Sequence, residues 1–196
     1  MQLVRLTPEL LLSAYCQGVF PMAHDDGSIY WYDPDPRAII PLENFHIPRS
    51  LHRTLKKRLF AVTRDQAFSQ VICECAAPAP GREHTWISDE IVEAYERLHR
   101  LGWAHSVEVW RNGRLAGGLY GVAVGGLFAG ESMFSRETDA SKVALVHLVH
   151  HLKQQGFTLL DTQFLTSHLQ RFGAIEIPAS QYKAQLQHAL TVNAQF

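Results

Sequence analysis

The chain has 196 residues, 46% of them hydrophobic, which suffices for one sizeable core and a small second lobe. With 18 Lys and Arg against 19 Asp and Glu the net charge is −1, so a nucleic-acid partner must be held by a local basic patch rather than by overall charge. The three cysteines have neither zinc-site spacing nor a disulfide framework, and no apolar span is long enough to cross a membrane, so we expect a cytoplasmic protein.

The N-terminal part combines one short helix with proline-rich extended chain. Thr7 is a suitable N-cap for a helix over residues 8–18, and the prolines that follow restrict the chain to short strands at 29–32 and 38–40. We therefore predict a small N-terminal lobe over residues 1–41. Its aromatic side chains could close over a cleft or form a small core of their own: Phe20, Tyr30, Trp31 and Tyr32.

The next helix, predicted over residues 49–59, has two contrasting faces. Leu51, Leu55 and Leu59 form an apolar stripe. The opposite face carries only basic side chains: Arg49, Arg53, Lys56 and Lys57. A charged face is often merely solvated, but charges of one sign repel each other, which favours binding of phosphate groups.

Two more helices and two hairpins follow. One helix is predicted over residues 68–75. A second helix has Ser88 as its N-cap and ends at Gly102. Two pairs of residues suited to tight turns, Asn112-Gly113 and Gly125-Gly126, then indicate two β-hairpins, because such turns need positive φ. The second hairpin joins strands predicted over residues 115–124 and 127–134.

The C-terminal third alternates helices and strands. A long helix ending at Gly156 buries a leucine-rich face, and a strand over 157–164, a short helix, a short strand and a last helix through Tyr182 and Leu186 complete the chain. This order predicts an α+β fold with a mixed sheet flanked by helices.

Three polar residues lie inside otherwise apolar strands: Glu131, Asp161 and Gln163. Because strand side chains alternate, Asp161 and Gln163 should point the same way, about 7 Å apart. A buried carboxylate is costly without a partner, so each residue needs either a hydrogen-bond partner or a chemical role. The alternative is that the three residues only satisfy one another.

Other chemical signals are weak. His147 and His151 share a helix face but have no third ligand at a metal-site spacing. The glycines of GGLYGVAVGG lie in strands and do not form a phosphate loop, and no serine or cysteine nucleophile motif occurs. We therefore expect neither a metal nor a cofactor.

Several segments, in order along nearly the whole chain, resemble the leucyl/phenylalanyl-tRNA–protein transferases. They are FPM…WYDPDPRAII, TWI, VEAYERLH, HSVEVW, GGLYGVAVGGLFAGESMFS, ASKVAL and LLDTQFL…H…FGA. The resemblance implies an acetyltransferase-like catalytic domain over residues 42–196. It also implies transfer of Leu or Phe, and less well Met, from aminoacyl-tRNA to an N-terminal Arg or Lys of a protein, which marks that protein for degradation.

The resemblance also assigns residues. It implies a catalytic pair at Asp161 and Gln163 with a pocket glutamate at Glu131. The implied pocket for the carried side chain consists of Leu119, Phe128, Leu145, Leu148, Leu152 and Leu160. The implied contacts to the terminal adenosine are Trp86, Phe20, Met22 and Tyr15. The implied contacts to tRNA phosphates are Arg53, Lys56 and Lys57.

The sequence departs from the family where Met22 replaces a frequent Trp, so adenine stacking there is weaker or supplied by Phe20 or Tyr15. We expect Asp161 to accept a hydrogen bond from the Gln163 side-chain amide, so that the Gln163 oxygen faces the attacking amine. Two alternatives remain. An acetyl-CoA N-acetyltransferase would carry a glycine-containing loop where this chain has SRETDASK, and an RNA-binding module would need no catalytic pair.

Overall fold

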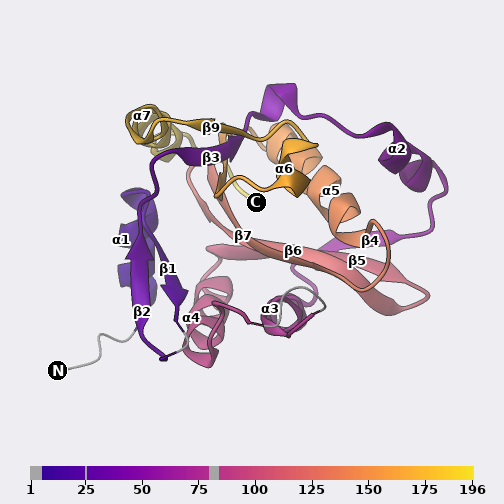
Figure 1. Ribbon diagram of the computed structural model, residues 1–196, viewed down its shortest axis with the longest axis horizontal. Helices are drawn as coiled ribbons and strands as arrows, with labels where there is room; N and C mark the ends of the chain where they lie inside the picture. Colours follow the sequence, from indigo (N-terminus) through magenta and orange to yellow (C-terminus); the bar gives the residue numbers. More distant parts are fainter. Residues whose placement is uncertain (1–5, 25, 80–83) are drawn as a thin grey trace.

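Figure 1 shows the computed structural model of the chain, in which residues 6–24, 26–79 and 84–196 are described. The helices are α1 (Pro8–Cys16), α2 (Arg49–Lys56), α3 (Phe68–Ala76), α4 (Asp89–Arg100), α5 (Ala140–Gln154), α6 (Ser167–Gln170) and α7 (Ala179–Leu190), with a 3-10 turn η1 (Leu42–Asn44). The strands are β1 (Phe20–Ala23), β2 (Ile29–Tyr32), β3 (Arg37–Ile40), β4 (Ala61–Arg64), β5 (Ala104–Arg111), β6 (Arg114–Val124), β7 (Leu127–Ser135), β8 (Leu159–Gln163) and β9 (Ile175–Ile177).

Among the described residues, the strands form one large sheet and one hairpin. The seven-stranded sheet has the order β4-β5-β6-β7-β8-β3-β9, and β1 pairs separately with β2. All neighbours are antiparallel except β7 and β8, which are parallel. Helices cover the sheet on two sides, with α5 and α6 opposite α3 and α4 (Figure 1). The predicted α+β class, with a mixed sheet flanked by helices, is confirmed.

The N-terminal elements are tied to the rest of the molecule. Leu11 and Tyr15 of α1 belong to the same buried cluster as the inner faces of α3 and α4. Strand β3 hydrogen-bonds to β8 on one side and to β9 on the other, so it belongs to the large sheet rather than to the hairpin. A division at residue 41 stays a prediction, and residues 1–5 and 25 of the predicted lobe lie outside the described residues.

The two predicted turns have the expected backbone. Asn112 and Gly113 connect β5 to β6 with φ of 51° and 72°, and Gly125, with φ of 57°, connects β6 to β7. A Cβ atom on Gly125 would also lie 2.8 Å from the carbonyl oxygen of Ala189. Glycine is therefore required at this turn both for its conformation and for space.

The sheet opens between β7 and β8. Their parallel pairing covers only residues 127–129 of β7, opposite 159–161 of β8, after which β7 continues without this partner. In addition, Tyr120 pairs with Ser132 and Gly121 with Gly130, so Glu131 is the extra residue of a β-bulge. The divergence and the bulge leave room for side chains between the two strands.

One local expectation was wrong, and two strands were missed. Helix α2 ends at Lys56, because Arg58 takes a left-handed φ of 50°, and Leu59 is 47% exposed instead of continuing the apolar stripe. Strands β1 and β4 were not expected. Each has four residues, too few to show a clear period, and β1 contains Pro21.

A buried acid, Glu108 of β5, holds the start of α3 against the sheet. Its carboxylate accepts hydrogen bonds from the hydroxyl groups of Thr63, at 2.5 Å, and Ser106. The backbone amides of Gln66 and Ala67 lie 3.4 Å from its oxygens. Both amides directly precede α3, whose N-cap is Ala67, so Glu108 fixes the chain where it enters the helix.

We expect Glu108→Ala to lower the free energy of unfolding by about 2–3 kcal/mol or more, because it leaves buried hydroxyl and amide groups without an acceptor. Urea denaturation followed by circular dichroism measures the change. Glu137→Ala is a matched control, because its partly exposed pair with Arg111 should contribute only about 0–1 kcal/mol. Equal losses in the two variants would show that Glu108 does not have this role.

Candidate active site

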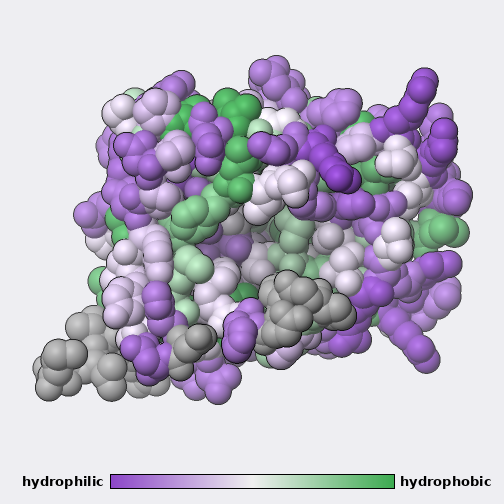
Figure 2. Space-filling view, viewed as in Figure 1, coloured by the Kyte–Doolittle hydropathy of each residue, from purple (hydrophilic) through white to green (hydrophobic). Residues whose placement is uncertain are grey.

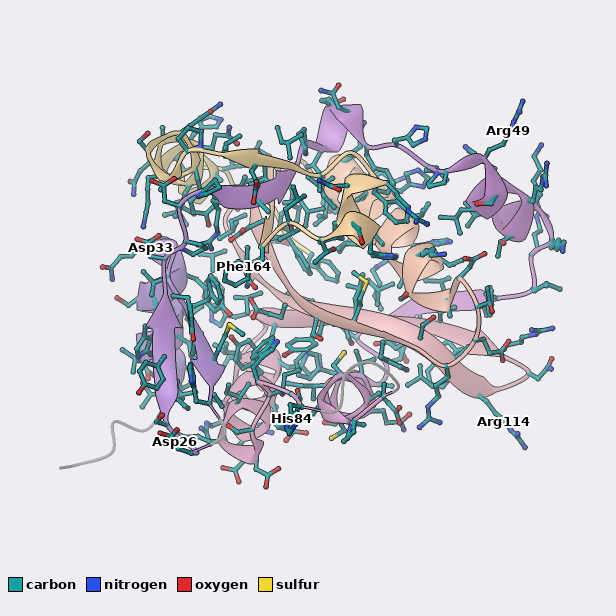
Figure 3. The ribbon with its side chains drawn as sticks, viewed as in Figure 1. Asp26, Asp33, Arg49, His84, Arg114 and Phe164 are labelled. Carbon is teal, nitrogen blue, oxygen red and sulfur yellow. The ribbon has the colours of Figure 1, made fainter. Side chains whose placement is uncertain are left out.

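The opening between β7 and β8 leads into a cavity of about 280 Å³. Leu119 of β6, Leu160 of β8, and Leu145 and Leu148 of α5 line it with apolar side chains. The middle of this face is hollowed in Figure 2, and Phe164, labelled in Figure 3, belongs to the cavity wall. The cavity is large enough for a single amino-acid side chain with part of a larger ligand.

Two of the side chains expected in this pocket lie elsewhere. Phe128 and Leu152 are both fully buried and do not line the cavity. Phe128 stacks on Phe196, with ring centroids 5.3 Å apart. The face of a strand or helix reveals that a residue points inward, but not whether a cavity or another side chain meets it there, so a role of these two residues in binding the carried side chain stays a prediction. Met133, which was not predicted, does line the cavity.

Glu131 and Gln163 form the polar wall of the cavity. The Gln163 side-chain amide donates to Glu131 Oε1 at 2.9 Å, and the Tyr15 hydroxyl donates to the same oxygen at 2.8 Å. Tyr95 contacts Tyr15 through their hydroxyl groups and lies 3.4 Å from Glu131 Oε2. Burial raises the pKa of Glu131 to about 8, against the opposing effect of the Tyr15 hydrogen bond.

Asp161 lies behind this wall, and its oxygens are fully engaged. Oδ1 accepts from Arg37 Nε and from the Gln163 backbone amide, both at 2.9 Å. Oδ2 accepts from Arg37 Nη2 at 2.6 Å and from the Tyr182 hydroxyl at 2.9 Å. The side chains of Asp161 and Arg37 are each 1% exposed. Asp161 does not line the cavity, so it has neither the access nor a free lone pair for a ligand.

The expectation of a hydrogen bond between the Asp161 carboxylate and the Gln163 side chain was therefore wrong. Asp161 accepts from the Gln163 backbone instead, and the Gln163 side chain turns to Glu131. Gln163 has a φ of 65°, so the regular alternation of strand side chains breaks at this residue. Within the described part of the chain, no group hydrogen-bonds to Gln163 Oε1, which leaves this acceptor available at the cavity wall.

The four residues expected to contact adenosine separate into two groups. Trp86 and Met22 line the cavity. Tyr15 and Phe20 are 2% and 1% exposed and do not line it. The Phe20 ring packs under the Arg37 guanidinium, 4.9 Å from its centroid. Tyr15 and Phe20 are inaccessible because the N-terminal elements pack into the main core instead of forming a small core of their own.

The roles of Arg37 and Tyr182, the two side chains that hold Asp161, were not predicted from the sequence. A signal was present, since Arg37 begins a strand that is otherwise apolar, RAII, and a buried strand seldom carries an unpaired cation. Asp161 and Arg37 are 124 positions apart, however, and no local pattern joins them.

The predicted phosphate-binding residues Arg53 and Lys56 of α2 and Lys57, its C-cap, are exposed. No ion pair to any of them occurs among the described residues. Arg49 marks the α2 end of the molecule in Figure 3, away from Phe164, and none of these cations lines the cavity. Their binding role stays a prediction.

The described residues contain neither a candidate metal site nor a candidate membrane-spanning helix. No group of three or more His, Cys, Asp and Glu side chains among them could hold a metal ion. Of the helices they form, none has the length and apolar character needed to cross a membrane.

Solved structures similar to this chain share little sequence with it. L-PGS from Bacillus licheniformis is 14% identical, with a TM-score of 0.46, over 84% of this chain and 55% of the other. An acetyltransferase of the GNAT family from Staphylococcus aureus Mu50 is 13% identical, with a TM-score of 0.37, over 50% of this chain and 69% of the other. At these scores the similarity carries no argument about function.

Sequence relatives match the chain far more closely. A family model described as leucyl/phenylalanyl-tRNA protein transferase matches residues 39–187, and one for the N-terminal domain of the same family matches residues 5–35. A leucyl/phenylalanyl-tRNA–protein transferase of Herpetosiphon aurantiacus is 55% identical over 98% of both chains, and one of Nitrobacter winogradskyi is 58% identical over 97% of this chain and 86% of the relative. The chain therefore belongs to the leucyl/phenylalanyl-tRNA–protein transferases, a family of aminoacyltransferases.

Proposed function

We propose that this protein, acting in the cytoplasm, moves Leu or Phe, and less well Met, from aminoacyl-tRNA to an N-terminal Arg or Lys of an acceptor protein, which marks the acceptor for degradation. The names of its relatives supply the donor amino acids and the protein acceptor. The observation that carries the mechanism is the free Gln163 oxygen at the wall of an apolar cavity.

The reaction is the aminolysis of an ester. The α-amine of the acceptor attacks the aminoacyl carbonyl, a C–N bond forms, and the bond to the ribose 3′-oxygen breaks as that oxygen takes up a proton. An α-amine has a pKa of about 8, so a useful fraction is neutral near pH 7. Because the ester is already activated, positioning the two reactants supplies much of the catalysis.

Gln163 would align the attacking amine. Its Nε2 donates to Glu131, which fixes the orientation of the amide and leaves Oε1 to accept a hydrogen bond from the amine. A neutral amide is too weak a base to remove the proton itself, so the role is alignment and stabilisation of developing charge. Glu131, with its raised pKa, would ionise when an ammonium group of either substrate binds beside it.

Asp161 would act as a positioning residue. Through the Gln163 backbone amide it holds that residue in its left-handed conformation, while Arg37 and Tyr182 hold the carboxylate. The site is therefore built on the end of a strand of the central sheet, which limits the movement of the Gln163 side chain.

The leucine-lined cavity would select the donor. Leu, Phe and Met side chains are unbranched at Cβ and could enter between Leu145, Leu148 and Leu160. Val and Ile carry an extra group at Cβ, next to the reacting ester, and should fit less well. An apolar pocket distinguishes substrates by only about 1–3 kcal/mol per methylene, so selectivity should be graded. Trp86 and Met22 would contact the terminal adenosine.

Mass spectrometry tests the proposal directly. With phenylalanyl-tRNA, a peptide that begins with Arg should gain one Phe residue, and the same peptide beginning with Ala should not. Leucyl-tRNA should give the equivalent gain of Leu. Failure with both charged tRNAs, in a protein that still binds tRNA, would favour an RNA-binding module instead.

We expect Gln163→Met to lower kcat about 100-fold or more, because methionine keeps the volume of the side chain but cannot accept a hydrogen bond from the amine. KM for the charged tRNA should change little. Gln170→Met, the same replacement on the exposed surface of α6, is the control. Normal turnover in Gln163→Met would show that the oxygen does not act on the amine.

The raised pKa of Glu131 also predicts a dependence of stability on pH. Between its ordinary value of 4.5 and about 8, the folded protein keeps a proton that the unfolded chain has lost. The contribution of this group to stability therefore falls as the pH rises through that range. Glu131→Gln removes it, so the unfolding free energy of the variant relative to wild type should rise with pH. A flat difference, as expected for Gln170→Met, would contradict the assignment.

A further inference from the structure

Cationic side chains without an acidic partner are concentrated on one part of the molecule. Arginines and lysines elsewhere are mostly paired, as in Arg136–Glu74 and Lys183–Asp33. Among the described residues, the cations in no ion pair are Arg49, Arg53, Lys56, Lys57, Arg58, Arg64, Arg100, Arg114 and Arg171. The largest group lies on α2 and the turn after it, and hydrophilic side chains predominate at that end in Figure 2.

Arg171 is the member of this set that belongs to the cavity region. It follows α6, whose residues His168 and Leu169 line the cavity. Arg171 keeps a helical backbone, with φ of −64° and ψ of −18°, three residues after His168, so the two side chains lie on the same face of the turn. The Arg171 side chain is exposed, and no polar group of the described chain engages it.

Lys142 of α5, whose own charge is paired with Asp139, links α2 to the cavity region. Thr54 of α2 donates to Asp139 Oδ2 at 2.8 Å, and Lys142 of α5 donates to Asp139 Oδ1 at 2.7 Å. Burial first, and then the charges of Lys142 and Arg171, lower the pKa of His168, so both cations act on the same cavity wall. Unpaired cations thus lie on α2 and at Arg171, and the ion pair of Lys142 with Asp139 contacts α2 through Thr54.

We propose that Arg171 binds a backbone phosphate of the single-stranded 3′ end of the charged tRNA. The inference rests on the proposed function and extends it to a residue outside α2. With the aminoacyl group in the cavity and the terminal adenosine beside Trp86 and Met22, the preceding phosphates must leave through the mouth of the cavity. A guanidinium offers two parallel N–H donors to a phosphate and suits this position better than a neutral side chain.

A series of donors that differ in phosphate content provides the test. The donors are a phenylalanyl ester of adenosine, which has no phosphate, the same ester on the trinucleotide CCA, and phenylalanyl-tRNA. For Arg171→Gln, kcat/KM should fall about 10-fold with the two phosphate-bearing donors, and the loss should be absent with the adenosine ester. Arg114→Gln, which removes an unpaired exposed arginine from the distant β5–β6 turn, should behave as wild type with all three.

Binding of uncharged tRNA, followed by fluorescence anisotropy over a series of salt concentrations, tests the contact without transfer. One lost contact to a single strand should reduce the slope of log K against log salt by about 0.7. An unchanged slope, equal losses with all donors, or a loss seen only with acidic acceptor peptides would overturn the inference. If Arg171→Gln reduced the salt slope but the wild-type protein transferred no amino acid, the proposed function would be overturned and the contact between Arg171 and phosphate would stand.

Discussion

The buried pair between Arg37 and Asp161 is the interaction on which the rest of the site depends. It joins β3 to β8 with two hydrogen bonds, and Arg37 also donates to the carbonyl oxygen of Gly18 at 2.7 Å, which ties the end of α1 to the same point. Two fully buried charges cost much to desolvate, and apolar replacements of such pairs are often as stable. We infer that the pair is kept for position, because Asp161 in turn holds the backbone of Gln163.

The carboxylates of Asp161 and Glu131 therefore both hold Gln163, each through a different group. Asp161, bound by Arg37, holds the Gln163 backbone, whereas Glu131 holds the Gln163 side chain. The difference in environment follows from the partners, a guanidinium for Asp161 and tyrosine hydroxyl groups for Glu131. In the proposed mechanism, this arrangement would direct a lone pair of the Gln163 side-chain oxygen to the substrate.

The location of the site follows from the sheet. Where β7 and β8 stop pairing and Glu131 forms a bulge, side chains enter a gap that regular pairing would have closed. The leucines of α5, together with Leu119 and Leu160 of the strands, form the apolar side of the gap, and Glu131 and Gln163 form the polar side. A narrow cavity with one apolar and one polar wall suits a ligand with an apolar side chain next to a reactive polar group.

The sequence by itself determined the features that depend on a few neighbouring residues. Turns at Asn112-Gly113 and Gly125-Gly126 follow from the conformational freedom of those residues, and helix and strand faces follow from hydrophobic periodicity. Only the tertiary structure decided what meets at a buried point. It joined Asp161 to Arg37 rather than to the Gln163 side chain, and it placed Phe128 against Phe196 instead of the cavity. Such contacts arise between residues far apart in the chain, where burial rather than local preference selects the partner.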